Sequence, residues 1–140
     1  MIVTLQRSNQ SVRFTGANAA GNTVTIEGSP DIGGEGLGAR PMELLLMSLA
    51  SCSSMDLVTI LKKMRQPLND LKVTVDGERA TEEKPPVFKK IHLHFDLWGA
   101  LREENVVKAL RLSVDEYCSV ARMLAKTAVI TWDFSIHPKP

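Results

Sequence analysis

Cysteine is scarce in this sequence, which holds only Cys52 and Cys118 among its 140 residues, 66 positions apart. A chain of this length can bury a core without disulfide or metal staples, and we expect one domain spanning residues 1–140. In a reducing compartment a permanent disulfide between two such residues is not expected. The two cysteines are therefore either inert core residues or residues that do chemistry.

An excess of charge of one sign is also lacking, because 17 Lys and Arg face 16 Asp and Glu. Without a basic block, the electrostatic signature of a protein that binds nucleic acid or anionic membranes is missing. The N-terminal "MIVTLQRSNQ" does not resemble a signal peptide, and charged residues and serines interrupt the apolar stretch 42–64. We expect a cytoplasmic protein with no nucleic-acid or membrane partner.

Hydrophobic periodicity predicts the element order βββ-α-ββ-α-α-β, which is typical of an α+β fold. The clearest signal is residues 87–98, where Ile91 and Leu93 alternate with His92 and His94. We expect strands at residues 2–7, 11–16, 22–28, 71–75, 87–98 and 128–136, and helices at 41–64, 102–112 and 113–126.

The predicted helix at residues 41–64 is apolar nearly all round in its first half. Such a helix needs cover on most sides, and one domain of this size cannot easily supply it. We therefore expect a partner subunit to form part of its surroundings. Cys52 stands at the middle of this helix, and Asp56 one turn later opposes a negative charge on its sulfur.

The other cysteine lies in the last predicted helix. Ser113 and Glu116 match a capping box, which predicts that a helix begins there and places Cys118 in its second turn. The helix dipole and Arg122, one turn further on, would both favour a thiolate at Cys118. The alternative is that both thiols are inert and buried, which is common for free cysteine.

Two segments, "RPMELLLMSLASCSSMDLVTIL" and "YCSVARMLAKTAVITWDF", resemble the OsmC/Ohr family of osmotically induced and organic-hydroperoxide-resistance proteins, in particular its YhfA-like branch. The resemblance implies an OsmC-like fold: an intertwined homodimer whose long central helices pack on antiparallel sheets. It also implies that Cys52 attacks a hydroperoxide to give a sulfenic acid, and that Cys118 condenses with it to a disulfide. An external dithiol such as a lipoyl group would reduce that disulfide, with no bound cofactor.

This chemistry suits the residues present. A thiolate is a good nucleophile toward the weak O–O bond, and a nearby thiol protects the sulfenic acid from overoxidation. Apolar walls from Leu45, Leu46 and Met55 would favour organic hydroperoxides over hydrogen peroxide. The alternative function is an OsmC-like protein without efficient peroxidase activity that binds a small apolar ligand or senses oxidants.

The sequence departs from the family pattern at the groups that activate the thiol. Peroxidase members carry a glutamate ten positions before the reactive cysteine, which holds an arginine; here that position is Met42, and the carboxylate is at Glu43. On an ideal helix Glu43 faces away from Cys52. Arg7 and Arg13 are the candidates for the arginine, since Arg40 lies about 18 Å from Cys52 along the helix.

Two further patterns suggest other sites. His92, His94 and Asp96 share one strand face and could bind a metal, although we favour a solvated face and no metal site. The glycine-rich "GGEGLGARP" precedes a helix and resembles a phosphate cradle only weakly, because it lacks the Lys-Ser/Thr of a P-loop. We expect it to be a mobile loop that could cover the mouth of a pocket.

Overall fold

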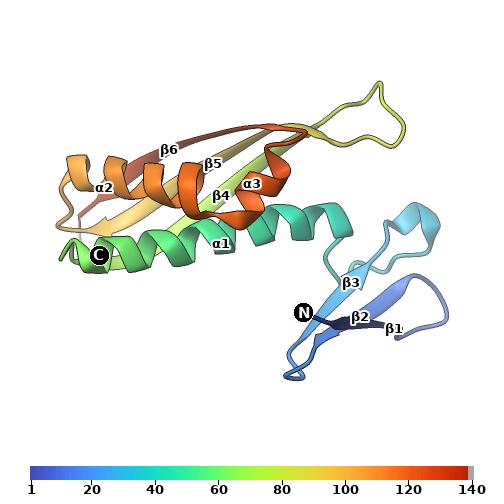
Figure 1. Ribbon diagram of the computed structural model, residues 1–140. Helices are drawn as coiled ribbons and strands as arrows, with labels where there is room; N and C mark the ends of the chain where they lie inside the picture. The colour runs from blue at the N-terminus through green and yellow to red at the C-terminus, as the bar shows by residue number, and fades with distance from the viewer. Residues whose placement is uncertain (139–140) are drawn as a thin grey trace. The chain divides into compact units, whose positions relative to one another are not determined.

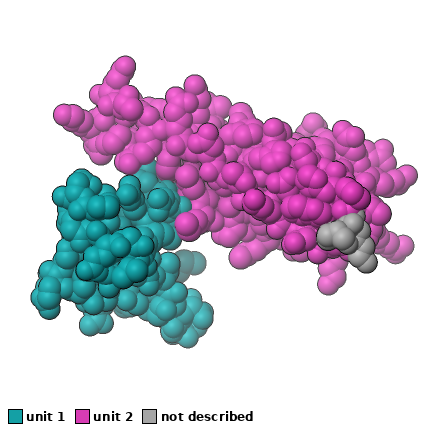
Figure 2. All heavy atoms as spheres, turned by 180° about the vertical axis from the view of Figure 1, so that it is seen from behind, with its two compact units in different colours: residues 1–45 teal, residues 46–140 magenta. Residues whose placement is uncertain are grey.

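The computed structural model describes residues 1–138. They form two compact units, residues 1–45 and the rest of the chain, which Figure 2 shows in teal and magenta. Each unit contains one three-stranded sheet, and the chain also forms helices. The predicted α+β fold and its element order are confirmed, whereas the single domain stays a prediction.

The first unit is an antiparallel meander of β1 (Val3–Arg7), β2 (Arg13–Asn18) and β3 (Thr23–Glu27), followed by the short 3-10 helix η1 (Pro30–Ile32). The glycine-rich segment then returns to β3, where the Glu27 N–H donates to the Ala39 carbonyl at 3.0 Å. This segment, which the sequence suggested to be a mobile loop, is thus fastened to a strand. All of β1 is exposed.

The second unit is built on β4 (Leu68–Arg79), β5 (Phe88–Gly99) and β6 (Val129–His137). The β5 alternation is confirmed, because Ile91, Leu93 and Phe95 are buried while His92 and His94 are half-exposed on the other face. β4 pairs with β5 in antiparallel fashion, but β6 pairs with β5 in parallel. The parallel pair differs from the antiparallel sheets that the resemblance implied.

The helices of the second unit lie on one face of this sheet (Figure 1). They are α1 (Pro41–Lys63), which enters from the first unit, α2 (Glu103–Leu110), the π-helix η2 (Arg111–Tyr117) and α3 (Ser119–Leu124). α1 buries the stripe Leu49, Ser53, Leu57 and Leu61, which repeats every four residues as one face of a helix does. At β4, Gly77 leaves room for Leu46, whose side chain lies 3.0 Å from where a Cβ would stand.

Outside that stripe α1 is poorly covered. Met47, Met55 and Val58 are exposed. α1 is long and apolar enough to cross a membrane by length and composition, and only 22% of its most apolar window is buried. Within the second unit, the described residues thus leave this face of the helix uncovered.

The predicted helix at 113–126 is wrong at its start. Ser113 lies inside the π-helix η2, and its hydroxyl donates to the Ser53 carbonyl on α1 instead of accepting from a backbone N–H of its own helix, while Glu116 is exposed. The new helix begins only after Cys118, as α3. A tertiary hydrogen bond has thus replaced the local capping box.

Candidate active site

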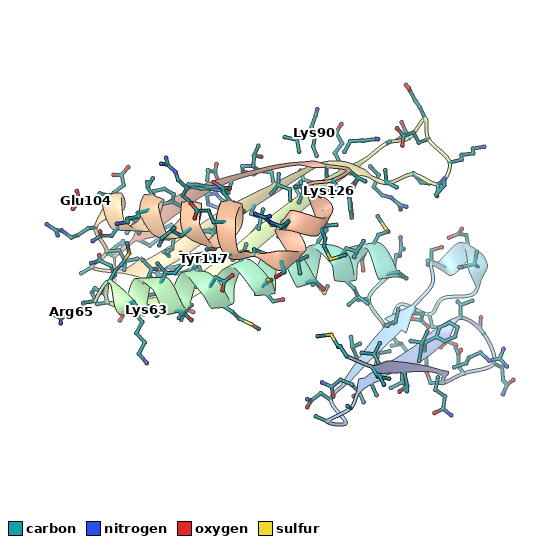
Figure 3. The ribbon with its side chains drawn as sticks, viewed as in Figure 1. Lys63, Arg65, Lys90, Glu104, Tyr117 and Lys126 are labelled. Carbon is teal, nitrogen blue, oxygen red and sulfur yellow. The ribbon has the colours of Figure 1, made fainter. Side chains whose placement is uncertain are left out.

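Cys118 lies at the junction between η2 and α3, where it is the N-cap residue of α3. Its Sγ accepts a hydrogen bond from the Ala121 N–H at 3.3 Å, which satisfies one of the free donors at the helix start. The side chain is buried, at 2% exposure. Tyr117, labelled in Figure 3, precedes it at the end of η2 and is exposed.

Burial raises the pKa of the Cys118 thiol to about 11, although the Ala121 N–H opposes this. The nearby Cys52 contributes a smaller part of this rise in the pKa. The expectation that the helix dipole and Arg122 make Cys118 a thiolate is therefore wrong, because desolvation outweighs the dipole. Cys118 keeps its proton at neutral pH.

Cys52 is half-buried on α1 and lies close enough to Cys118 to influence its pKa. Two sulfurs 66 positions apart in the sequence are thus brought together, one from the middle of a long helix and one from a helix start. Both are free thiols in the structure. The pair can exist as two thiols or, after a two-electron oxidation, as a disulfide.

Two buried serines connect the segments that carry the thiols. The Ser113 hydroxyl donates to the Ser53 carbonyl at 2.8 Å, and both residues are fully buried. Sequence reasoning missed this contact, because a serine in an apolar helix carries no signal of its partner. The bond ties η2 to the turn of α1 next to Cys52.

The two candidate arginines differ in their surroundings. Arg13 donates to the Glu27 carboxylate at 3.1 Å and pairs with Glu35, whereas Arg7 ends the exposed strand β1. Burial would raise the pKa of Glu27, but the Leu37 N–H, which donates at 2.6 Å, and Arg13 together lower it. The buried Glu27, which sequence reasoning missed, thus holds Arg13 and fastens the glycine-rich segment.

Glu43 has a structural role at the start of α1. Its carboxylate accepts a hydrogen bond from the Arg40 N–H at 2.9 Å. An acidic side chain in the first turn also interacts favourably with the helix dipole. Glu43 therefore caps α1, and we find no ion pair between it and an arginine among residues 1–138.

All three histidines of the chain meet on the face of the second sheet that points away from the helices. The parallel register sets His94 beside Asp133, and His137 reaches Asp96 at 2.7 Å and stacks on Trp98. Asp133 and His137 were missed because the pairing of β6 was unknown. No group of three or more ligating side chains that could hold a metal occurs among residues 1–138.

We expect the His94–Asp133 pair to make stability depend on pH. The Asp133 hydrogen bond raises the pKa of His94 above 6.5, and His94 lowers the pKa of Asp133 below 3.8. The His94 contribution is present below its unfolded pKa and lost as pH rises through the folded value. The Asp133 contribution is present above its unfolded pKa and lost as pH falls through the folded value.

The His94–Asp133 pair should therefore contribute most to the free energy of unfolding between about pH 4 and 6.5. Because the pair is partly exposed and screened by solvent, Asp133→Asn should lose about 0.2–1 kcal/mol there and less outside this window. Urea unfolding from pH 3.5 to 9 measures the difference, with Glu116→Gln, an exposed acidic residue, as control. A constant difference across this range would show that the pair does not titrate as described.

Comparison with known proteins identifies related sequences. A family model described as OsmC-like protein matches residues 33–133. The chain is 38% identical to Protein YhfA of Escherichia coli (strain K12) over 128 residues, which cover 91% of this chain and 92% of that protein.

Solved structures share the fold. A hypothetical protein from Aquifex aeolicus is 31% identical, with a TM-score of 0.80, and the match covers 97% of this chain and 96% of that one. A protein from Legionella pneumophila, named as an organic hydroperoxide resistance protein OsmC, has a TM-score of 0.69 at 16% identity, covering 96% of this chain and 97% of that one. At that identity the likeness shows the fold alone.

Proposed function

Because the chain belongs to the OsmC-like protein family, we propose that it is a cysteine-based peroxidase that reduces organic hydroperoxides as a defence against oxidative stress. Cys52 is the nucleophile and Cys118 the resolving thiol. The observation that carries this proposal is the meeting of the two thiols within the second unit. The Legionella pneumophila protein, whose name refers to hydroperoxide resistance, shares the fold with this chain.

The different burial of the two cysteines supports their different roles. Cys118 is buried and protonated, with a pKa raised to about 11, so it is a poor first nucleophile. Cys52 is only half-buried and can meet a hydroperoxide from solvent. A thiol that stays protonated until its neighbour is oxidised is suited to the resolving step.

The reaction balances with one hydroperoxide and two thiols. The Cys52 thiolate attacks the terminal oxygen, the O–O bond breaks, and the alkoxide leaves as an alcohol after taking a proton. The Cys118 sulfur then attacks the Cys52 sulfenic acid, so that the S–S bond forms and water leaves with the Cys118 proton. An external dithiol such as a lipoyl group restores both thiols by exchange.

Roles for apolar side chains, an arginine and Glu43 complete the proposal. Leu45, Leu46 and Met55 supply apolar walls that favour organic hydroperoxides. The arginine that the family resemblance implies is assigned to Arg13 or Arg7, of which Arg13 is held by two carboxylates whereas Arg7 ends an exposed strand. Glu43 caps its helix and takes no part.

We also propose that the protein is a soluble, cytoplasmic homodimer. The exposed apolar face of α1, including Met47, Met55 and Val58, needs cover that the described residues of the second unit do not supply. A second copy that brings the same helix would supply it through a symmetric interface. The apolar helix would then be a core helix of the dimer.

The test adds one equivalent of cumene hydroperoxide to the reduced protein and maps the cysteines by mass spectrometry. We expect a Cys52–Cys118 disulfide, and catalytic consumption of hydroperoxide when dithiothreitol or a lipoyl dithiol is present. Cys52→Ser should reduce consumption to the uncatalysed rate, whereas Ser51→Ala, an exposed neighbour, should not. Activity that survives in Cys52→Ser would refute the assignment.

A second function is favoured by Met42, which stands where peroxidase members carry a glutamate. In that case the protein senses oxidants or binds a small apolar ligand. The same experiment separates the two, because a sensor forms the disulfide with one equivalent of hydroperoxide but shows no sustained turnover with a dithiol.

A further inference from the structure

We propose that Ser113 is a positioning residue that holds Cys52 and Cys118 at the separation from which their sulfurs can bond. The inference deepens the proposed function and rests on it, since it concerns the same pair of thiols. It assigns to one buried hydroxyl the task of joining two segments that are far apart in the sequence.

Ser113 makes two hydrogen bonds to the backbone, one beside Cys52 and one at Cys118. Its hydroxyl donates to the carbonyl of Ser53, the residue after Cys52, at 2.8 Å. Its carbonyl accepts from the Cys118 N–H at 2.9 Å. A single residue therefore links the peptide that follows one cysteine to the amide of the other, and a shift at Ser113 moves both.

The π-helical register makes this link possible. In an α-helix the Cys118 N–H would bond to the carbonyl four residues back, which belongs to Val114. In η2 it bonds five residues back, to the residue whose side chain also reaches α1. Because of this wider turn, Ser113 bonds both to α1, through its hydroxyl, and to the Cys118 N–H, through its carbonyl.

The surroundings keep the bond in place. Ser113 and Ser53 are fully buried, so water cannot replace the lost partner if the hydroxyl is removed. The Ser53 hydroxyl does not compete, because it donates to the Leu49 and Ala50 carbonyls of its own helix at 2.8 and 3.1 Å. Of the two serine hydroxyls, that of Ser113 alone crosses from one segment to the other.

This difference supplies a matched pair of variants. Ser113→Ala and Ser53→Ala each delete one buried hydroxyl of the same size, but only the first removes the bond between η2 and α1. The readout is the midpoint potential of the Cys52–Cys118 disulfide in the full-length protein, equilibrated with dithiothreitol mixtures. This measurement needs no hydroperoxide.

We expect Ser113→Ala to lower the equilibrium constant for disulfide formation about 10- to 100-fold, because a displacement near 1 Å costs that much in an intramolecular reaction. Each tenfold loss raises the midpoint potential by about 30 mV. Ser53→Ala should leave the potential unchanged. An unchanged potential in Ser113→Ala, or equal shifts in both variants, would overturn the proposal.

A second pair covers the case that Ser113→Ala does not fold. Ser113→Thr keeps the hydroxyl and Ser113→Val has nearly the same shape without it, so the potential should rise in the valine variant relative to the threonine variant. Equal potentials in this pair contradict the role of Ser113. A normal disulfide potential in the wild type without hydroperoxide turnover would instead contradict the proposed function and leave the inference standing.

Discussion

Replacing Cys118 with serine is expected to stop the catalytic cycle after its first step. Without the resolving thiol, the Cys52 sulfenic acid must wait for an external thiol, so turnover with a dithiol should fall at least about 100-fold. With excess hydroperoxide, Cys52 should advance to the sulfinic and sulfonic acids. Mass spectrometry of the intact protein should then show two and three added oxygen atoms on the peptide that contains Cys52.

Serine is the right replacement because Cys118 also caps α3. A serine oxygen can accept the Ala121 N–H in place of the sulfur, so the variant should fold. Ser119→Ala, which removes an exposed hydroxyl next to the site, is the control and should turn over normally. If Cys118→Ser keeps wild-type turnover and resists overoxidation, Cys118 is not the resolving residue.

An acidic residue on the exposed apolar face of α1 is expected to dissociate the proposed dimer. Met55 is 69% exposed in the single chain, so Met55→Asp adds a charge that the monomer tolerates but a covered interface does not. An unpaired buried charge costs about 3–5 kcal/mol, which raises the Kd of the dimer at least about 100-fold.

Light scattering over a range of concentrations measures this change directly. Thr74→Asp, on the exposed face of β4, is the control and should leave the dimer intact. A wild-type protein that is a stable monomer, or a Met55→Asp variant that dimerises with unchanged strength, would contradict the proposed interface.

The sequence predicted those elements whose signal is local. The strict alternation in β5 identified the buried face of the second sheet, and Pro41 together with the long apolar run identified α1 almost to the residue. These signals succeed because each strand or helix shows its own period, whatever it later packs against.

Elements decided by tertiary contacts were not predictable in this way. Ser113 and Glu116 form a valid local capping pattern, but the buried bond from Ser113 to Ser53 favours a π-helix instead. The prediction that Cys118 is a thiolate was wrong for the same reason, because desolvation depends on neighbours that are distant in the sequence.

The candidate site was only partly predictable. That Cys52 and Cys118 meet followed from the family resemblance and not from their spacing. Glu27 was missed because the cross-strand pair Arg13–Glu27 depends on the register of β2 and β3, which the turn between them sets. Local patterns thus suggested the chemistry, while partners across strands and helices needed the three-dimensional structure.

The parallel pairing of β5 with β6 has a consequence for the order of assembly. β4 and β5 form a local hairpin, but β6 returns only after α2, η2 and α3 have passed across the sheet. Closing so long a connection costs more conformational entropy than closing a hairpin, so the last strand docks late. This strand brings Asp133 to His94 and His137 to Trp98. These two contacts therefore report on the completion of the fold rather than on its nucleus.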